Sequence, residues 1–290
     1  MDYDFHISQL RTLLAVAEAG NFQAAADLIG RTQSAVTQQM QKLETLTGAK
    51  LFRQVGRRRE FTPAGLTLVN YAREILSMSR FAVAALHQAD EQGVVRLGAP
   101  QEIAERLLPS ILAEFAQNWP SVRVVIQVGR SPDLMGMVQD GRLDLTLSTR
   151  RSEHLNGMRI ASIPAYWLAS PDFEWDRHMP VPLILADEPS MFRRIALAAL
   201  DVSGLPFIER VTSPSLAGIR LSVAAGLGVT VRTESSFFSD IRVLGPDDGM
   251  PPLPLVNYFA YLRKGAVQDY MRVLFDMIVA EGTRSLGNAP

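Results

Sequence analysis

The feature that most constrains the fold is residues 21–62, which read NFQAAADLIGRTQSAVTQQMQKLETLTGAKLFRQVGRRREFT. The pattern predicts a short alanine-rich helix, a turn at Gly30, a second helix with a polar outer face, and then an arginine cluster. Positions 31–59 hold seven basic residues and one acidic residue, Glu44, in a chain of formal net charge −1. A basic island in a near-neutral chain indicates one surface for one anionic partner. This order of elements is typical of proteins that lay a helix in a DNA groove.

Composition excludes several classes of protein. The chain has 290 residues and no cysteine, so disulfides, thiolate nucleophiles and zinc–thiolate fingers are excluded. The length allows two or three domains, each with its own core. The acidic N-terminus predicts no secretory signal, and without an apolar run of about 18 residues no membrane span is predicted. We therefore expect a cytoplasmic protein that does not contact a membrane.

Residues 5–62 have the pattern of three helices followed by a two-stranded wing. Leucines at helical spacing predict a first helix that ends before Gly20. A second helix over 23–29 and a third helix from Thr32 toward Leu46 follow, because Thr32 is a good N-cap. The arginine cluster, with an aromatic residue on each side, then predicts the wing.

The third helix has two different faces. On a helical wheel Val36, Met40 and Leu43 fall on one side, where they can pack on the alanines of the preceding helix. The other side carries amides and hydroxyls, which pair with base edges, whereas arginines suit phosphates or a minor groove. The predicted DNA contacts are Ser34, Thr37, Gln38, Gln41, Arg57, Arg58 and Arg59. The alternative is a solvated polar face beside a solvated charge run.

A long helix is predicted directly after the wing. Thr62 is an N-cap, Pro63 suits the first helical position, and up to about residue 90 the only helix breaker is Gly65. One set of positions recurs at steps of four and three residues, which is typical of a seam between two helices and implies a dimer. The expected dimerisation residues are Leu68, Ala72, Ile75, Ala82 and Leu86. The alternative is a helix that packs on its own domain.

From residue 94 the pattern changes to alternating strands and helices. The first set has strands at 94–99, 122–128 and 143–148 and helices at 103–117 and 132–139. The second set has strands at 166–169, 183–185, 207–211 and 229–232 and helices at 192–200 and 216–225. A strand at 255–262 and a helix at 268–280 follow. This alternation predicts largely parallel sheets covered on both faces, arranged as two lobes with a cleft between them.

A ligand in that cleft is expected where helices begin, because backbone N–H groups and the helix dipole attract anions there. The candidate effector-binding residues are Gln101, Glu102, Ser131, Ser213 and Ser215 at helix starts, and Thr230, which follows the GLG turn near a strand. Ser190 is a further helix start, and Arg193 and Arg194 can bind a carboxylate. Each hydroxyl is also a good helix cap, and each arginine can simply be solvated. Convergence of several candidates on one cleft distinguishes these alternatives.

An enzyme and a protein-binding scaffold are the competing classes. The four histidines are scattered, and no Walker loop, GxSxG elbow or GxGxxG motif occurs. Asp144 and Asp187 are isolated carboxylates near strands, which favours structural or capping roles. A two-lobed protein that uses its N-terminal helices for protein association would rarely need so concentrated a positive patch. We therefore expect no catalytic residue, no metal ligand and no cofactor.

Residues 7–65 resemble the winged helix-turn-helix of LysR-type transcriptional regulators, through ISQLRTLLAVAEAGNFQAAADLIG, TQSAVTQQMQKLE, GAKLF and GRRREFTPAG. The remainder resembles the effector-binding module of that family, through RLGAPQEIAERLLPSIL, GRLDLTLS and AAGLGVTV. TQSAVTQQMQKLE and PLILADEPSMFRRIALAAL are most similar to the LrhA/HexA/PecT-like branch, whose repressors control motility, secreted enzymes and virulence. The resemblance implies an effector domain similar to periplasmic binding proteins of type II.

Carried over by position, the resemblance implies that Gln33 and Thr37 read bases at the start of the third helix. Ser34 and Gln38 stand where the family frequently has proline and arginine. The wing arginine of the family corresponds to Gln54 here, so Arg53 makes the minor-groove contact or that contact is missing. The implied assembly is a homodimer or a homotetramer on an interrupted palindrome in promoter DNA. RNA polymerase is a further expected partner.

The predicted protein is a sequence-specific transcriptional regulator that senses a small-molecule effector. Its expected fold class is α/β, with an N-terminal all-α winged helix-turn-helix, a long linker helix and a two-lobed effector domain. The expected domains are residues 1–62 for DNA binding, 63–91 for the linker and dimerisation helix, and 92–290 for effector binding. Within the last domain, lobe I covers 92–162 and 264–290, and lobe II covers 163–263.

Overall fold

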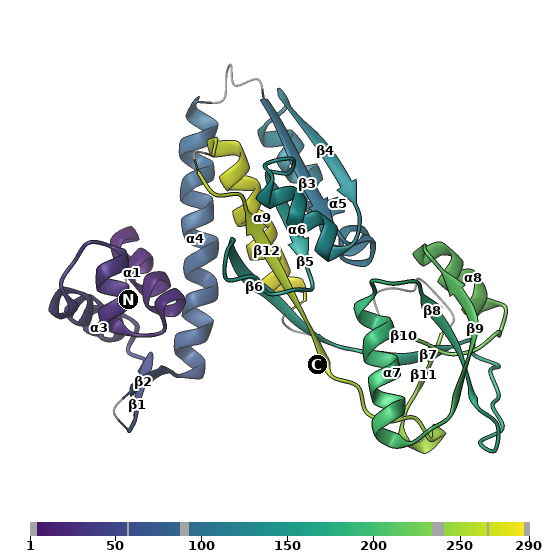
Figure 1. The fold of residues 1–290 in the computed structure, drawn as a ribbon. Coiled ribbons are helices and arrows are strands. Elements are labelled where there is room, and N and C mark those ends of the chain that lie inside the picture. Colours follow the sequence, from purple (N-terminus) through teal and green to yellow (C-terminus); the bar gives the residue numbers. More distant parts are fainter. Residues whose placement is uncertain (1–4, 57, 88–92, 234–240, 266, 287–290) are drawn as a thin grey trace. The chain divides into compact units, whose positions relative to one another are not determined.

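The computed structural model describes residues 5–56, 58–87, 93–233, 241–265 and 267–286. By its internal contacts the chain divides into two compact units, Met1–Asp90 and Glu91–Pro290. Figure 1 labels most elements of the two units, each of which is built around its own core. The long linker helix, predicted as a segment of its own, belongs to the first unit.

The first unit begins with the predicted three helices and wing. Its elements are α1 (Ile7–Ala19), α2 (Phe22–Leu28), α3 (Gln33–Thr47), β1 (Phe52–Val55) and β2 (Arg58–Phe61). Side-chain caps begin the second and third helices: Asn21 accepts a hydrogen bond from the Ala24 N–H at 2.8 Å, and Thr32 accepts one from the Ala35 N–H at 3.2 Å. The helix breaks are therefore specified locally.

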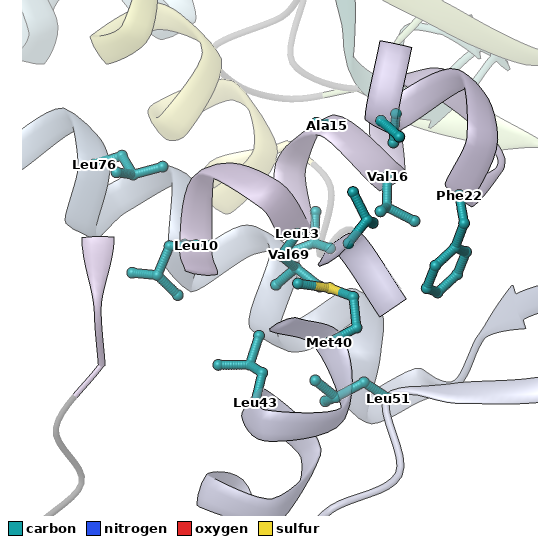
Figure 2. Close-up of a cluster of buried hydrophobic side chains, with 14 residues drawn as sticks. Leu10, Leu13, Ala15, Val16, Phe22, Met40, Leu43, Leu51, Val69 and Leu76 are labelled. Carbon is teal, nitrogen blue, oxygen red and sulfur yellow. The ribbon is translucent and has the colours of Figure 1, made fainter. Parts of the chain in front are cut away.

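Figure 2 shows the hydrophobic cluster that holds these elements together, with side chains from α1, α3 and the long helix around one centre. Val36, Met40 and Leu43 of α3 are at most 2% exposed. Ala25 and Ala26 of α2 are fully buried, and their small side chains allow the helices to approach closely. The predicted apolar face of α3 is thus the buried one, and its polar face is left outside.

Helix α4 (Pro63–His87) follows the wing. A Cβ added at Gly65 would lie 2.2 Å from the Leu51 carbonyl oxygen, so a side chain there would push the helix away from the wing. Ala72 is fully buried, and Leu68 and Ile75 are half-buried, all three within the core of the first unit. The first half of the expected seam therefore packs on its own unit. The side chains of Ala82 and Leu86 lie outside the described residues.

The first lobe of the second unit is a five-stranded sheet of order β4-β3-β5-β12-β6. Its strands are β3 (Gly93–Ala99), β4 (Val122–Val128), β5 (Leu145–Ser148), β6 (Asn156–Pro164) and β12 (Leu255–Leu262). Its helices are α5 (Gln101–Asn118), α6 (Ser131–Gln139) and α9 (Asp269–Ser285). Helices α5 and α9 pack against each other, and right-handed crossovers place α6 on the opposite face of the sheet.

The second lobe holds a parallel pair, β8 (Val181–Ala186) and β9 (Phe207–Ser213), and a three-stranded sheet. That sheet has the order β10 (Thr230–Arg232), β7 (Tyr166–Ala169), β11 (Arg242–Leu244). A bridge between Leu183 and Val229 links the two sheets. Helices α7 (Met191–Ser203) and α8 (Leu216–Ala224) follow β8 and β9, and the short 3-10 helix η2 (Pro246–Asp248) follows β11.

The second unit differs from the prediction in its return path. The strand predicted over 255–262 is β12, but it lies in the first lobe, antiparallel to β5 and β6. The chain therefore returns to the first lobe at residue 255 rather than at 264. Strand β6 was not predicted, because its sequence NGMRIASIP is neither continuously apolar nor alternating. Together β6 and β12 make the first sheet mixed rather than largely parallel.

Two chain segments join the lobes, one at Ala165 between β6 and β7 and the other over residues 245–254 between β11 and β12. The Ala165 N–H donates to the Pro254 carbonyl at 3.3 Å, so the two segments are held together. Among the described residues, none of the helices combines the length and the apolarity that crossing a bilayer requires.

Candidate nucleic-acid interface and ligand pocket

The outer face of α3 is polar and accessible. Gln33, Ser34, Gln38 and Gln41 are exposed, and Thr37 is half-buried. Gln39 is different, because its side chain accepts a hydrogen bond from the Thr12 hydroxyl and so faces the first helix. The structure thus brings the predicted amides and hydroxyls together on one accessible helix face, with the bulky apolar side chains of α3 on the other.

The wing carries the predicted basic side chains beside this helix. Arg53 is exposed and pairs with Glu60 across the two strands, at 3.2 Å. The Arg59 guanidinium lies 5.2 Å from the centre of the Phe22 ring, a cation–π contact that ties the wing to α2. Arg57 and the side chain of Arg58 lie outside the described residues.

Glu44, the acidic residue within the basic stretch, interacts with groups of the same chain. Its Oε1 accepts hydrogen bonds from the backbone N–H groups of Leu51 and Phe52, at 2.8 and 3.2 Å. Its Oε2 lies 3.5 Å from Lys50, and the side chain is only 15% exposed. The negative charge is therefore used to attach the wing to the C-terminal part of α3.

The second unit contains a cavity of about 380 Å³ lined by both lobes. It is bordered by the starts of four helices, namely Gln101 and Glu102 of α5, Ser131 of α6, Met191 and Phe192 of α7, and Leu216 of α8. Four of the six predicted effector residues line it: Gln101, Glu102, Ser131 and Ser215. The other two, Ser213 and Thr230, are buried and do not line the cavity.

The serine side chains at and near this cavity form different hydrogen bonds. The side chains of Ser190 and Ser215 accept hydrogen bonds from the Arg193 and Gly218 N–H groups, so both are helix caps, which is the alternative role. The Ser213 hydroxyl donates to the Ser215 carbonyl and stabilises the same turn. Ser131 Oγ accepts a hydrogen bond from the Thr149 N–H at 3.0 Å and lies 3.1 Å from the Thr149 hydroxyl, which also lines the cavity.

A buried ion pair lies in the cavity wall. The Arg232 Nε on β10 is 3.1 Å from the Glu102 carboxylate on α5, and Arg232 is only 5% exposed. The Arg232 guanidinium also lies 4.7 Å from the centre of the Phe192 ring. Burial raises the pKa of the neighbouring Tyr258, and the charge of Glu102 adds to this effect. Tyr258 therefore remains a neutral hydroxyl in the cavity wall.

Two further ion pairs connect the lobes. Arg130, before α6, pairs with the Asp187 carboxylate and donates to the Asp187 carbonyl at 3.1 Å. Arg220 of α8 donates to Glu105 of α5 at 2.7 Å. Burial acts to raise the pKa of Glu105, but hydrogen bonds from Arg220 and Gln101 outweigh it and hold that pKa below the usual value. The two lobes are thus linked by ion pairs as well as by the two chain segments that join them.

Several residues of the cavity were not predicted from the sequence, including Arg130, Thr149, Arg232 and Tyr258. Arg232 carried a usable signal, because it is the last residue of the buried strand predicted in AAGLGVTVRT, where a charge needs a partner. Of the two arginines singled out, Arg194 lines the cavity, whereas Arg193 is paired with Glu188 and Glu209.

The isolated carboxylates have structural partners. Asp144 is buried, accepts a hydrogen bond from the Arg96 N–H at 2.8 Å and lies 3.1 Å from Arg263. Asp187 pairs with Arg130. Within the described ranges no group of three or more histidine, aspartate or glutamate side chains could hold a metal ion.

Residues 7–66 match the family described as bacterial regulatory helix-turn-helix protein, lysR family, and residues 88–283 match the LysR substrate binding domain. The chain is 36% identical over 276 residues to the HTH-type transcriptional regulator PecT of Dickeya dadantii, which covers 95% of this chain and 87% of that protein. It is 32% identical over 251 residues to DgdR of Burkholderia cepacia, covering 87% of this chain and 85% of that one.

Solved structures share the fold. CrgA, a LysR-type transcriptional regulator from Neisseria meningitidis, superposes with a TM-score of 0.73 at 20% identity, covering 98% of this chain and 100% of that one. Vibrio fischeri DarR, solved in complex with DNA, has a TM-score of 0.55 at 18% identity over 95% and 99% of the two chains. A winged helix-turn-helix with a two-lobed, cavity-containing module defines a ligand-responsive DNA-binding regulator. The chain belongs to the LysR family of transcriptional regulators.

The position of the wing should depend on the hydrogen bonds accepted by Glu44. Glu44→Ala leaves the Leu51 and Phe52 N–H groups without their acceptor and should lower the free energy of unfolding by about 1–3 kcal/mol. DNA affinity should fall as well, although a negative charge is removed. Glu44→Gln retains an acceptor oxygen without the charge and should keep or improve DNA affinity. Tighter DNA binding by Glu44→Ala than by Glu44→Gln in a titration would contradict this role.

Proposed function

We propose that α3 reads base edges through Gln33, Ser34, Thr37, Gln38 and Gln41, and that the wing holds the DNA backbone. The observation that carries this proposal is the division of α3 into a buried apolar face and an accessible face of amides and hydroxyls. Glutamine can form paired hydrogen bonds with adenine, and the threonine methyl group can contact thymine. In this proposal residues 1–62 bind DNA.

Arg53 takes the place of the family's wing arginine in this proposal. Its pair with Glu60 is exposed on both sides, at 64% and 48% of the side-chain surface. An exposed pair stabilises the fold by about 0–1 kcal/mol, so a phosphate can replace Glu60 at little cost. Gln54 donates to the Gly56 carbonyl at 2.8 Å and thereby shapes the wing turn instead. Arg57, Arg58 and Arg59 would add phosphate contacts.

Substitutions in the helix and in the wing should have different consequences for DNA binding. Gln33→Ala should reduce discrimination between a preferred site and unrelated DNA by about 1–3 kcal/mol, because a base contact is lost. Arg53→Ala should weaken binding to both DNAs and lower the slope of affinity against salt by about 1. Affinities for both DNAs at several salt concentrations test this. Unchanged discrimination in Gln33→Ala would reject the assignment of α3 as the reading helix.

The cavity of the second unit is, in this proposal, the effector site. Gln101, Glu102, Ser131 and Ser215 are the predicted contacts that line it, and residues 92–290 form the effector-binding domain. An effector alters DNA binding only if its affinity differs between two arrangements of the protein. The cross-lobe ion pairs provide such a difference, because a change in lobe separation breaks them.

Weakening one cross-lobe pair should therefore change DNA binding at a distance. Arg220→Gln removes the bond to Glu105, which is worth up to about 1 kcal/mol, and should shift promoter affinity by up to about fivefold or alter the footprint. Arg142→Gln is the matched control, because its exposed pair with Asp140 lies within one lobe. Identical footprints and affinities for Arg220→Gln, Arg142→Gln and the unchanged protein would refute the coupling.

The active assembly in this proposal is a homodimer, joined through the C-terminal half of α4, which pairs further into a tetramer on promoter DNA near RNA polymerase. The heptad-like spacing of Ala82 and Leu86 supports it, as does the burial of Ala72, which confines the seam to the half of α4 beyond the core. Residues 63–91 are then the dimerisation segment.

Charge placed on the seam should separate the subunits. Ala82→Glu combined with Leu86→Glu should reduce the particle in sedimentation experiments to the 32.0 kDa monomer, because carboxylates would face each other across the seam. Thr67→Glu, at an exposed position on the same helix, is the control and should leave the mass unchanged. A double variant that keeps the wild-type mass would exclude this seam.

A further inference from the structure

The charges around the cavity favour an anion. Its lining contains four arginines and two glutamates, namely Arg130, Arg150, Arg194, Arg232, Glu102 and Glu188. Arg130 and Glu188 have partners outside the lining, in Asp187 and Arg193. The starts of α5, α6, α7 and α8 add the positive ends of four helix dipoles. The local field therefore favours negative charge within the cavity.

Among the arginines of the lining, Arg232 forms a buried ion pair between the two lobes. It comes from the second lobe, and it meets Glu102, from the first turn of α5 in the first lobe. Both side chains are nearly inaccessible, at 6% and 11% exposed, so the buried Arg232 guanidinium needs a carboxylate beside it. Removing either partner of a buried pair leaves a charge without compensation and is strongly destabilising. A carboxylate from another source can supply the same compensation.

The other residues of the lining indicate which kind of molecule could carry that carboxylate. Apolar side chains such as Val128, Met191, Phe192 and Leu216 border the cavity, and neutral Tyr258 adds a hydroxyl. A volume of about 380 Å³ is near the lower end for small-molecule sites. It fits a compact molecule with one acidic group and an apolar body.

We propose that Glu102 is a built-in substitute for the carboxylate of the effector, which is a small organic acid that binds Arg232 in place of Glu102. The proposal rests on the proposed function of the cavity as the effector site. When the ligand carboxylate takes Arg232, the ion pair between α5 and β10 is broken, and the displaced Glu102 carboxylate is still stabilised by the positive start of its own helix, α5. The ligand thus replaces an ion pair that linked the two lobes. Binding the acid and changing the lobe contacts are then one event, because both use the same guanidinium group.

Chemical rescue tests this role without knowledge of the natural ligand. Glu102→Ala leaves a space of carboxylate size beside Arg232, and its melting temperature should fall. Sodium acetate or propionate should then raise that temperature by about 2–4 °C more than it does for the unchanged protein. Acetamide, and sodium chloride at the same ionic strength, are the controls for charge and for salt.

Three comparisons decide the outcome. Glu105→Ala breaks a cross-lobe pair outside the cavity lining and should show no acetate-specific gain. Glu102→Ala combined with Arg232→Met should lose the gain. If Glu102→Ala does not fold, Glu102→Gln replaces it, and calorimetry should detect propionate binding that the unchanged protein shows more weakly.

An equal response of Glu102→Ala and Glu105→Ala to acetate would overturn the proposal. Rescue by inorganic phosphate without rescue by acetate would overturn its ligand class. Specific DNA binding by the unchanged protein is measured in parallel. Failure of rescue with that DNA binding intact rejects this inference alone, whereas absence of specific DNA binding rejects the proposed function.

Discussion

The packing of one face of α3 determines how this protein can act. Val36, Met40 and Leu43 are buried against the other helices of the first unit, so the helix cannot rotate without exposing them. Burying a large apolar side chain stabilises a fold by about 1.5–3 kcal/mol, which makes that orientation strongly preferred. Because the orientation is set, the amides and hydroxyls on the opposite face are presented outward without any need for a partner to position them. In the proposed function, DNA recognition is thus a consequence of core packing.

The cavity depends on a different constraint, which is connectivity. In a strand–helix unit the helix begins at the carboxyl end of the strand, and in a sheet with parallel strands these ends lie at one edge. Strands β3, β4, β8 and β9 are each followed by a helix whose start borders the cavity. Two lobes that face each other with these edges bring four positive helix ends around one space. If this space is the effector site, as proposed, ligand binding requires few dedicated residues, since the backbone supplies much of the field.

Charge is distributed differently in the two units. In the first unit the acidic Glu44 is engaged by backbone N–H groups, and the described arginines of the wing, Arg53 and Arg59, are exposed. In the second unit two of the four arginines that line the cavity already have carboxylate partners, Glu102 for Arg232 and Asp187 for Arg130. A ligand that binds either of these two arginines must compete with groups of the chain. A ligand that displaces a group of the chain changes the contacts between the lobes, and such a change can alter the shape of the protein.

The sequence by itself determined the local elements, because their causes are local. Thr32 caps α3, the apolar positions of α3 recur at helical spacing, and the arginines follow at once, so the DNA-binding unit could be predicted almost completely. In the second unit it determined most of the alternation of strands and helices, although not β6, and four of the six residues that it proposed as ligand contacts line the cavity. Only the tertiary structure decided that Arg232 and Glu102, 130 positions apart, form one buried pair, and that β12 lies between β5 and β6. It also decided that Ser215 borders the cavity while Ser213 and Thr230 do not. These outcomes depend on how segments that are distant in the sequence pack together, and local propensities do not encode that packing.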